Sequence, residues 1–434
     1  NVKVKTSLWK KTDHLAVAVS TGIDSMCLLY KLLNDLSHSY QSITCLHVNH
    51  GLRDASVEEE RFIKQFCKQH QIPCYVKQLD LSKIVEKGKS IQSEARDLRY
   101  QWFDEMMSKI NADVLLTAHH LNDQLETIFY RVFTGRSTRN SLGMHECTER
   151  NHYFICRPLI ETYKNDIKQY QTIHHVPFYE DESNHHNKYA RNDIRNRLLP
   201  AIDENKDFKV EQLLKLKHWH DMQLQLTQQR ISCFIEQYVN IYLNEERIQL
   251  SRASFNQLDE ISKMILLDRL FEMLQLNKSF SEKNYNEWFE QIESKQSQIK
   301  IPLTEKWIIQ IAYDKFIIMA HYEHSLLEEQ IVTHPYTYQF GHYLITIHPN
   351  ENNEAIDWPL TIRTRRDGDK FKLNGSHGHK KVSRLLIDKK IDSIERTQIP
   401  IILDAKQRVI AIGQLYVTTS FKHIIDIKKI GDDS

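Results

Sequence analysis

The amino-acid sequence predicts an α/β fold in which a doubly wound parallel sheet forms the N-terminal domain. Short, continuous apolar runs such as Leu15–Val19 are typical of strands buried on both faces. Each run precedes a segment such as Met26–Leu36, whose leucines recur at helical spacing. Strands and helices that alternate in this way form parallel sheets, and the ligands of such sheets bind beyond the carboxyl ends of the strands.

The alternation continues through the N-terminal part, so we expect ligand-binding residues in the loops after the first, second and fourth strands. The expected strands are Leu15–Val19, Ile43–Val48, Cys74–Leu79 and Val114–Leu116. The expected helices are Met26–Leu36, Ala55–His70, Gln92–Met107 and Asp123–Phe133.

The pattern changes beyond Glu211, where two long amphipathic helices with little strand signal between them precede a strand-rich segment. The helices are expected at Gln212–Glu236 and Ile261–Leu276, and strand-like runs at Trp307–Ile318, Tyr343–His348, Ile401–Leu403 and Val409–Ile412. Thr333–Glu354 is rich in His, Pro, Tyr and Asn and is the expected linker region. We therefore predict an α/β domain at 1–205, a helical central domain at 206–325 and a small α+β domain at 326–434.

Composition is that of an ordinary globular chain, with 41% hydrophobic residues, 26% charged residues and a net charge of only +1. No apolar run approaches the roughly 18 residues that span a bilayer, and Asn1–Lys11 lacks the apolar stretch of a signal peptide. The seven cysteines include no C-x-x-C pair, which argues against a disulfide framework, a structural zinc site or an iron–sulfur cluster. We expect a cytoplasmic protein with reduced thiols and no membrane contact.

The loop between the first strand and the first helix has the composition of a phosphate-binding turn. Unpaired N–H groups and the helix dipole attract anions there, small hydroxyl residues add donors, and a glycine admits the phosphate closely. A plain helix N-cap at Asp24 or Ser25 is the simpler alternative. The loop consists of Ser20, Thr21, Gly22, Ile23, Asp24 and Ser25.

Polar side chains also follow the fourth strand. His119, Asp123 and Glu126 are spaced so that they would share one helix face directed into the ligand crevice. Such a set suits either a metal-dependent hydrolase or a site that orients ATP–Mg²⁺ and moves protons.

Two groups of basic residues are candidates for binding an anion. Arg96 and Arg99 either pair with acids on a solvated helix face or contact phosphate or RNA. Arg191, Arg195 and Arg197 lie close together without enough neighbouring acids, which favours an anionic ligand. A third basic segment, 361–396, carries eleven Lys and Arg against five Asp and Glu and suits an RNA backbone.

These motifs together resemble a known family. The 20–25 loop resembles the S-G-G-x-D-S signature of the PP-loop ATP pyrophosphatases, with Thr21 standing where the family usually has glycine. Threonine resists a positive φ, so the loop must tolerate a non-glycine residue there. The order and spacing of the remaining motifs resemble the tRNA(Ile)-lysidine synthetase branch of that family. These motifs are His47–Arg53, Glu94–Arg96 with Arg99–Tyr100, Thr117–Thr127, Asp181–Asn184 and Arg191–Pro200.

The resemblance implies an enzyme that uses ATP and Mg²⁺ to join free L-lysine to the wobble cytidine of a tRNA(Ile) with a CAU anticodon. The base would first be adenylylated with release of pyrophosphate, and lysine would then displace AMP. Asp24 would contact the magnesium ion, and Arg96 and Arg195 would neutralise phosphate charge. Asp123, Glu126 and His119 are the candidates to orient lysine or accept its proton.

The resemblance also implies that the C-terminal domain recognises the tRNA, and it leaves open whether the enzyme is a homodimer. Three alternatives remain: a PP-loop tRNA thiolase, a non-catalytic ATP-dependent RNA-binding protein, and a metal-dependent hydrolase. The absence of C-x-x-C disfavours the thiolase.

Overall fold

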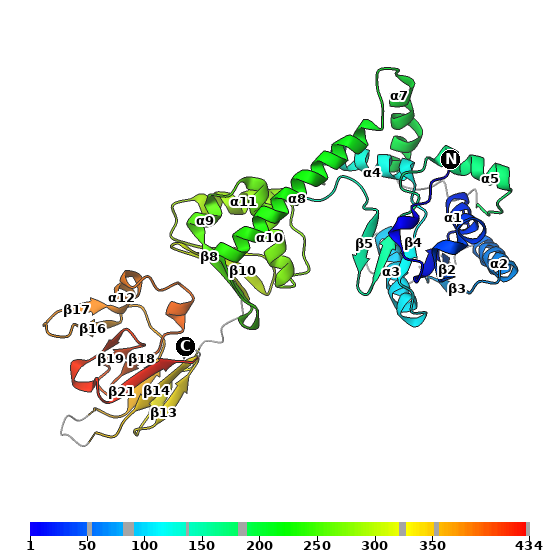
Figure 1. Cartoon of the computed structure of the whole chain (residues 1–434). Helices are drawn as coiled ribbons and strands as arrows, with labels where there is room; N and C mark the ends of the chain where they lie inside the picture. Colours follow the sequence, from blue (N-terminus) through cyan, green and yellow to red (C-terminus); the bar gives the residue numbers. More distant parts are fainter. Residues whose placement is uncertain are drawn as a thin grey trace. The chain divides into compact units, whose positions relative to one another are not determined.

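The computed structural model describes residues 1–49, 54–80, 91–135, 139–180, 189–320, 327–350 and 356–430 (Figure 1). The chain divides into two compact units, Asn1–Leu226 and Thr227–Ser434. Within the described ranges, no helix combines the length and apolar character needed to cross a bilayer.

A six-stranded sheet forms the centre of the first unit, in the order β3-β2-β1-β4-β6-β5. All neighbouring strands run parallel except β5 and β6, so the predicted parallel sheet is confirmed and gains an antiparallel edge strand that the sequence did not suggest. The chain passes from β3 at one edge to β4 beside β1, which opens a crevice at the carboxyl ends of β1 and β4. The strands are β1 (His14–Ala18), β2 (Ser42–Asn49), β3 (Cys74–Gln78), β4 (Val114–Leu116), β5 (Cys147–Arg150) and β6 (Tyr153–Cys156).

Helices cover both faces of this sheet, as a doubly wound fold requires. Leu15 and Val17 of β1 pack in a core with α1, α2 and α5, whereas Ala16 between them packs in a second core with α3. This alternation follows from the opposite directions of successive side chains in a strand. The helices are α1 (Ile23–Asn34), α2 (Asp54–Gln69), α3 (Ile91–Lys109), α4 (Leu121–Thr134), α5 (Lys164–His174), α6 (Tyr189–Asp193) and α7 (Leu199–Glu204).

The second unit begins within the long helix α8 (Gln212–Tyr238) and contains more strands than expected. A hairpin separates α8 from α10, where the sequence suggested little strand, and the run 307–318 is two strands joined by a turn at Tyr313 and Asp314. The elements are β7 (Val239–Tyr242), β8 (Arg247–Ser251), α9 (Arg252–Asn256), α10 (Glu260–Met273), α11 (Glu282–Glu293), β9 (Gln298–Pro302), β10 (Trp307–Ala312) and β11 (Lys315–Ala320).

The C-terminal part holds three small sheets around one apolar core. The prediction of a linker over 333–354 is wrong, because β13 and β14 form a hairpin there whose Phe340 and Tyr343 are buried. The predicted strands at 343–348, 401–403 and 409–412 are confirmed. The elements are β12 (Gln330–Val332), β13 (Thr337–Phe340), β14 (Tyr343–Ile347), β15 (Leu360–Arg363), β16 (Lys370–Lys372), β17 (His379–Lys381), α12 (Val382–Asp388), β18 (Ile401–Leu403), β19 (Val409–Ile412), β20 (Tyr416–Val417) and β21 (Ile425–Lys429).

One expectation about the cysteines is also wrong. Cys147 and Cys156 form a disulfide between β5 and β6, where the antiparallel register places them directly opposite one another. Five other cysteines are free thiols, of which Cys233 is exposed. Spacing along the chain did not reveal the pair, because it depends on a hairpin that the sequence did not predict.

Candidate active site

The 20–25 loop leads from β1 into the first turn of α1. Gly22 is the N-cap and makes no side-chain capping bond, so the alternative in which Asp24 or Ser25 caps the helix is wrong. The hydroxyl of Ser25 instead accepts the Ser20 N–H at 3.1 Å and lies 3.2 Å from the Ser20 hydroxyl. The loop is thereby folded around the helix N-terminus, where backbone N–H groups favour an anion.

A carboxylate already lies at this N-terminus. Glu180 accepts a hydrogen bond from the backbone N–H of Ile23 at 3.2 Å. The Glu180 oxygen is negatively charged and accepts from the same N–H group that a phosphate oxygen would use at this position. Its presence supports the interpretation of the loop as an anion site.

Thr21 has φ 72°, in the left-handed region that threonine resists. It is completely buried, its hydroxyl donates to the carbonyl oxygen of Tyr179 at 3.0 Å, and its own carbonyl accepts the Tyr179 N–H at 2.9 Å. These two bonds explain how the loop holds threonine where the family has glycine.

Two substitutions of Thr21 separate the cost of its backbone strain from the stabilisation by its hydrogen bond to Tyr179. We expect Thr21→Val to lower the free energy of unfolding by about 1–2 kcal/mol, because it keeps the strained conformation and loses the hydrogen bond. Thr21→Gly loses the same bond but relieves a strain of about 1–2 kcal/mol, so its stability should stay near that of the wild type. Denaturant unfolding of the three proteins measures both, and a valine variant as stable as the wild type would contradict this account.

Asp24 lies in the first turn of α1 and faces a lysine and a histidine. Its carboxylate is 2.6 Å from Nζ of Lys164 and 3.6 Å from Nε2 of His120. Burial raises the pKa of Asp24, but His120 and Lys164 outweigh it, and the net direction is downward. Asp24 is therefore a carboxylate at neutral pH, as a magnesium ligand must be.

The motif after β4 differs in detail from the expected helical face. α4 begins at Leu121, so His119 precedes the helix and His120 is the N-cap. A capping box joins His120 to Asp123, whose carboxylate accepts the His120 backbone N–H at 3.0 Å. The hydroxyl of Thr117 and Nδ1 of His119 are 2.9 Å apart. Burial, together with nearby positive charge, lowers the pKa of His119 to about 4 despite the opposing charge of Asp123, which makes its ring neutral near pH 7.

Arg195 brings the two predicted acids together. Its guanidinium lies 2.7 Å from the buried carboxylate of Glu126 and 3.4 Å from Asp123. It is held in a π-helical turn, Ile194–Leu198, a local structure that is common at functional sites.

The expectation that the arginines of this segment lack acidic partners is wrong. Besides the Arg195 pair, Arg197 makes two bonds of 2.6 Å to Asp193, and Arg191 lies 3.8 Å from Glu126. Arg191 and Arg195 are paired through the fold with Glu126, whereas Arg197 pairs with an acid four residues before it in the sequence.

The acids and His119 line a cavity of about 670 Å³ that is dominated by positive charge. Burial lowers the pKa of Arg99 and of Arg157, and Nε of each is buried without a hydrogen-bond partner among the described residues. Arg96 is exposed at the rim, 5.6 Å from the ring of Tyr100. Six arginines line the cavity: Arg96, Arg99, Arg131, Arg157, Arg191 and Arg195.

A second cavity of about 260 Å³ shares lining residues with the first and is bordered by part of the 20–25 loop. Its lining combines Ser20, Asp24 and Ser25 with apolar side chains of β1, β2 and α3, a mixture that suits a nucleoside and its phosphates. Four residues line both cavities: Arg99, Tyr100, His119 and Asp123. The two cavities therefore share two of the predicted catalytic residues, His119 and Asp123, whereas Glu126, Arg96 and Arg195 line only the larger one.

Sequence reasoning missed Lys164, Arg131, Arg157 and Glu180. Each reaches the site from a loop or helix with no recognisable motif, so only the fold reveals it. Of the predicted motifs, His50–Arg53 and Asp181–Asn184 lie outside the described residues.

The metal-dependent hydrolase alternative finds no support in the geometry. Among the described residues, the only group of three or more His, Cys, Asp and Glu residues whose ligand atoms all lie within 4.8 Å of one another consists of three cysteines outside both cavities. His120 and Asp123 are instead engaged in capping α4.

Comparison with known proteins identifies the family. A PP-loop domain model matches residues 2–202, and a TilS substrate C-terminal domain model matches residues 360–424. The chain is 51% identical over 433 residues to a tRNA(Ile)-lysidine synthase of Staphylococcus aureus (strain MRSA252), and 50% identical over 436 residues to one of Staphylococcus epidermidis, in each case covering 100% of both chains. A bifunctional protein TilS/HprT of Listeria monocytogenes is 28% identical over 94% of this chain and 65% of its own. The chain belongs to the tRNA(Ile)-lysidine synthase family, a family of PP-loop ligases.

Proposed function

We propose that this enzyme joins lysine to the wobble cytidine of a tRNA(Ile) with a CAU anticodon, at the expense of ATP. The observation that carries the proposal is the junction of the nucleotide cavity with the arginine-lined cavity at Arg99, Tyr100, His119 and Asp123. A nucleotide in the smaller cavity would present its α-phosphate to an RNA base in the larger one.

In the first step, the 2-carbonyl oxygen of the cytidine attacks the α-phosphorus, and pyrophosphate leaves. The loop N–H groups and the serine hydroxyls hold the phosphates, displacing the carboxylate of Glu180 from Ile23. Mg²⁺ would neutralise charge on the phosphates, and the ionised Asp24 suits it because magnesium binds through one or two carboxylates together with phosphate oxygens. Arg99 supplies further positive charge on the same side.

In the second step, the lysine ε-amine attacks the activated carbon, AMP leaves, and the amine loses its protons. Asp123 and Glu126 supply negative charge within the arginine-lined cavity and are our candidates to hold the lysine and accept a proton. Arg195 fixes both carboxylates in place.

The rate should rise with pH because the amine is nucleophilic only when deprotonated. Free lysine has a side-chain pKa of about 10.4, so kcat/KM for lysine should rise about tenfold per unit between pH 7 and pH 9. His119, with its pKa lowered to about 4, is neutral over this range and should add no inflection. A plateau above pH 7 that disappears in His119→Asn would instead make His119 the titrating base.

The C-terminal part, 326–434 in our domain division, is proposed to bind the tRNA. Lys370 and Lys381 face each other across β16 and β17 and are exposed. Like charges at such positions destabilise a hairpin unless an anion neutralises them. By contrast, Arg363 is buried and paired with Asp369 by two bonds, so it belongs to the core rather than to the basic surface.

We propose the cytoplasm, where tRNA and ATP are both present, as the place of the reaction.

Radiolabelled lysine tests the function directly. The protein is incubated with ATP, Mg²⁺ and a tRNA(Ile) transcript carrying CAU, and label is counted in acid-precipitated RNA after mild alkaline deacylation. We expect ATP-dependent label in this transcript and none in a twin whose wobble cytidine is uridine. Pyrophosphate release without lysine label would favour the thiolase alternative, and neither signal from folded protein would overturn the proposal.

A further inference from the structure

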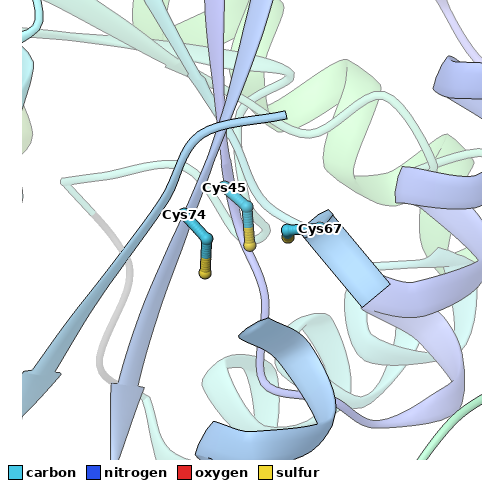
Figure 2. A group of neighbouring side chains, drawn as sticks. All are labelled: Cys45, Cys67 and Cys74. Atoms are coloured by element: carbon cyan, nitrogen blue, oxygen red, sulfur yellow. The ribbon is translucent and has the colours of Figure 1, made fainter. Parts of the chain in front are cut away.

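Three free cysteines come together on one side of the first sheet, away from both cavities. The sulfur atoms of Cys45, Cys67 and Cys74 all lie within 4.8 Å of one another. Figure 2 shows the three side chains beside each other, two from neighbouring strands and one from the adjacent helix. Cys45 and Cys67 are fully buried, whereas Cys74 is partly exposed.

The fold explains why the cysteines meet although their spacing showed no metal motif. Cys45 of β2 and Cys74 of β3 are register partners in a parallel pair, so their side chains lie on the same face of the sheet. Cys67 lies near the C-terminal end of α2, and the turn that follows is fixed by a bond from the N–H of Ile72 to the Cys67 carbonyl oxygen. A second bond, from the Cys45 N–H to the Pro73 carbonyl oxygen, ties this turn to β2.

The size of the cluster suits one ion. Zinc–sulfur bonds of about 2.3 Å at tetrahedral angles place sulfur atoms about 3.8 Å apart, which is within the span of the cluster. Thiolates are also the ligands that soft or borderline ions such as Zn²⁺ prefer.

A buried histidine on the same strand provides a second observation. His47, two residues after Cys45 on the same face of β2, is fully buried, and its Nε2 has no hydrogen-bond partner among the described residues. Its Nδ1 lies 2.6 Å from the carbonyl oxygen of Val19, which fixes the proton on Nδ1 and leaves a lone pair on Nε2. Metal-binding histidines are oriented by a bond of this kind.

We propose that Cys45, Cys67 and Cys74 bind one structural zinc ion. The ring nitrogens of His47 lie outside the group that the three sulfur atoms form, so the fourth position would be taken by a water molecule or by His47 after a shift of its ring. The ion would tie the end of α2 to the β2–β3 pair beneath it. Because such a site does not exist in the unfolded chain, its binding free energy would add to the stability of the N-terminal domain.

Metal analysis of the full-length protein tests the proposal independently of tRNA or ATP. The protein is purified under reducing conditions without chelator, and zinc per chain is measured by inductively coupled plasma mass spectrometry. We expect about one zinc per chain in the wild type and in the control Cys233→Ser, and less than about a tenth of that in Cys74→Ser. Replacing zinc by cobalt in the wild type should produce intense thiolate-to-cobalt charge-transfer absorption.

Three results would overturn the proposal. The first is wild-type protein that contains no zinc and whose free thiols all react with an alkylating agent after unfolding. This result would show that the three cysteines only pack against one another as apolar side chains. Peptide mapping that finds two of the three cysteines in a disulfide would assign the cluster to redox chemistry, and iron with inorganic sulfide would assign it to another cofactor. If Cys74→Ser does not fold, the zinc content and cobalt spectrum of the wild type decide alone.

Discussion

Asp123→Asn should abolish lysine transfer while the protein stays folded. Asparagine keeps an oxygen that can accept the backbone N–H of His120, so the capping box that starts α4 can survive. The substitution removes the negative charge that lies between the two cavities and 3.4 Å from the guanidinium of Arg195. A residue that handles a proton in the transition state contributes about 10²–10⁴ in rate, and we expect kcat to fall by that factor.

Asp166→Asn is a closely matched control. Asp166 occupies the same position in the first turn of α5 that Asp123 occupies in α4, and each follows an asparagine. It lines neither cavity. Circular dichroism should show both variants folded, and labelled lysine should separate them. Normal turnover by Asp123→Asn would remove Asp123 from the mechanism.

The sequence predicted the first sheet well because local patterns determine it. β1 and β4 consist almost wholly of buried apolar residues, and β2 is buried along most of its length although it contains polar side chains. The segments between the strands have helical periodicity. The linker prediction at 333–354 failed mainly at β13. This strand is short and only its last residue, Phe340, is buried, so it is recognisable as a strand only when it pairs with β14, whose run 343–348 was predicted.

The site was predicted where a single motif supplies its residues and missed where the fold gathers them. The loop Ser20–Ser25 has the residue types of a phosphate-binding turn, and His119, Asp123 and Glu126 are spaced closely enough in the sequence to be recognised as one group. Arg157, just after β6, lines the larger cavity, and Lys164 of α5 pairs with Asp24, both without any such spacing. Of the three clustered cysteines, Cys45 and Cys74 meet through strand register and Cys67 reaches them from α2. Pairing was misjudged for the same reason, because Arg195 finds Glu126, which lies in a different helix.

Arg99→Met should reduce adenylylation without reducing stability. Nε of Arg99 is buried without a partner among the described residues, its pKa is lowered by burial and by Arg96, and a ring contact with Tyr100 is its favourable interaction. A buried cation without an acidic partner destabilises the ligand-free protein, and binding of an anionic substrate would offset this cost. Methionine matches the length of the stem and removes the charge, so the free energy of unfolding should stay equal or increase.

The same substitution should slow tRNA-dependent pyrophosphate release by about 10²–10³, the usual loss when one preorganised charge or donor is removed from a transition state. Arg61→Met is the control, since Arg61 is exposed on α2 and pairs with Glu58. If Arg99 had a structural role, its substitution would lower both the stability and the activity of the protein. If Arg99 binds phosphate, the substitution lowers the activity alone. Pyrophosphate release at the wild-type rate from Arg99→Met would mean that the junction of the two cavities is not where the nucleotide reacts.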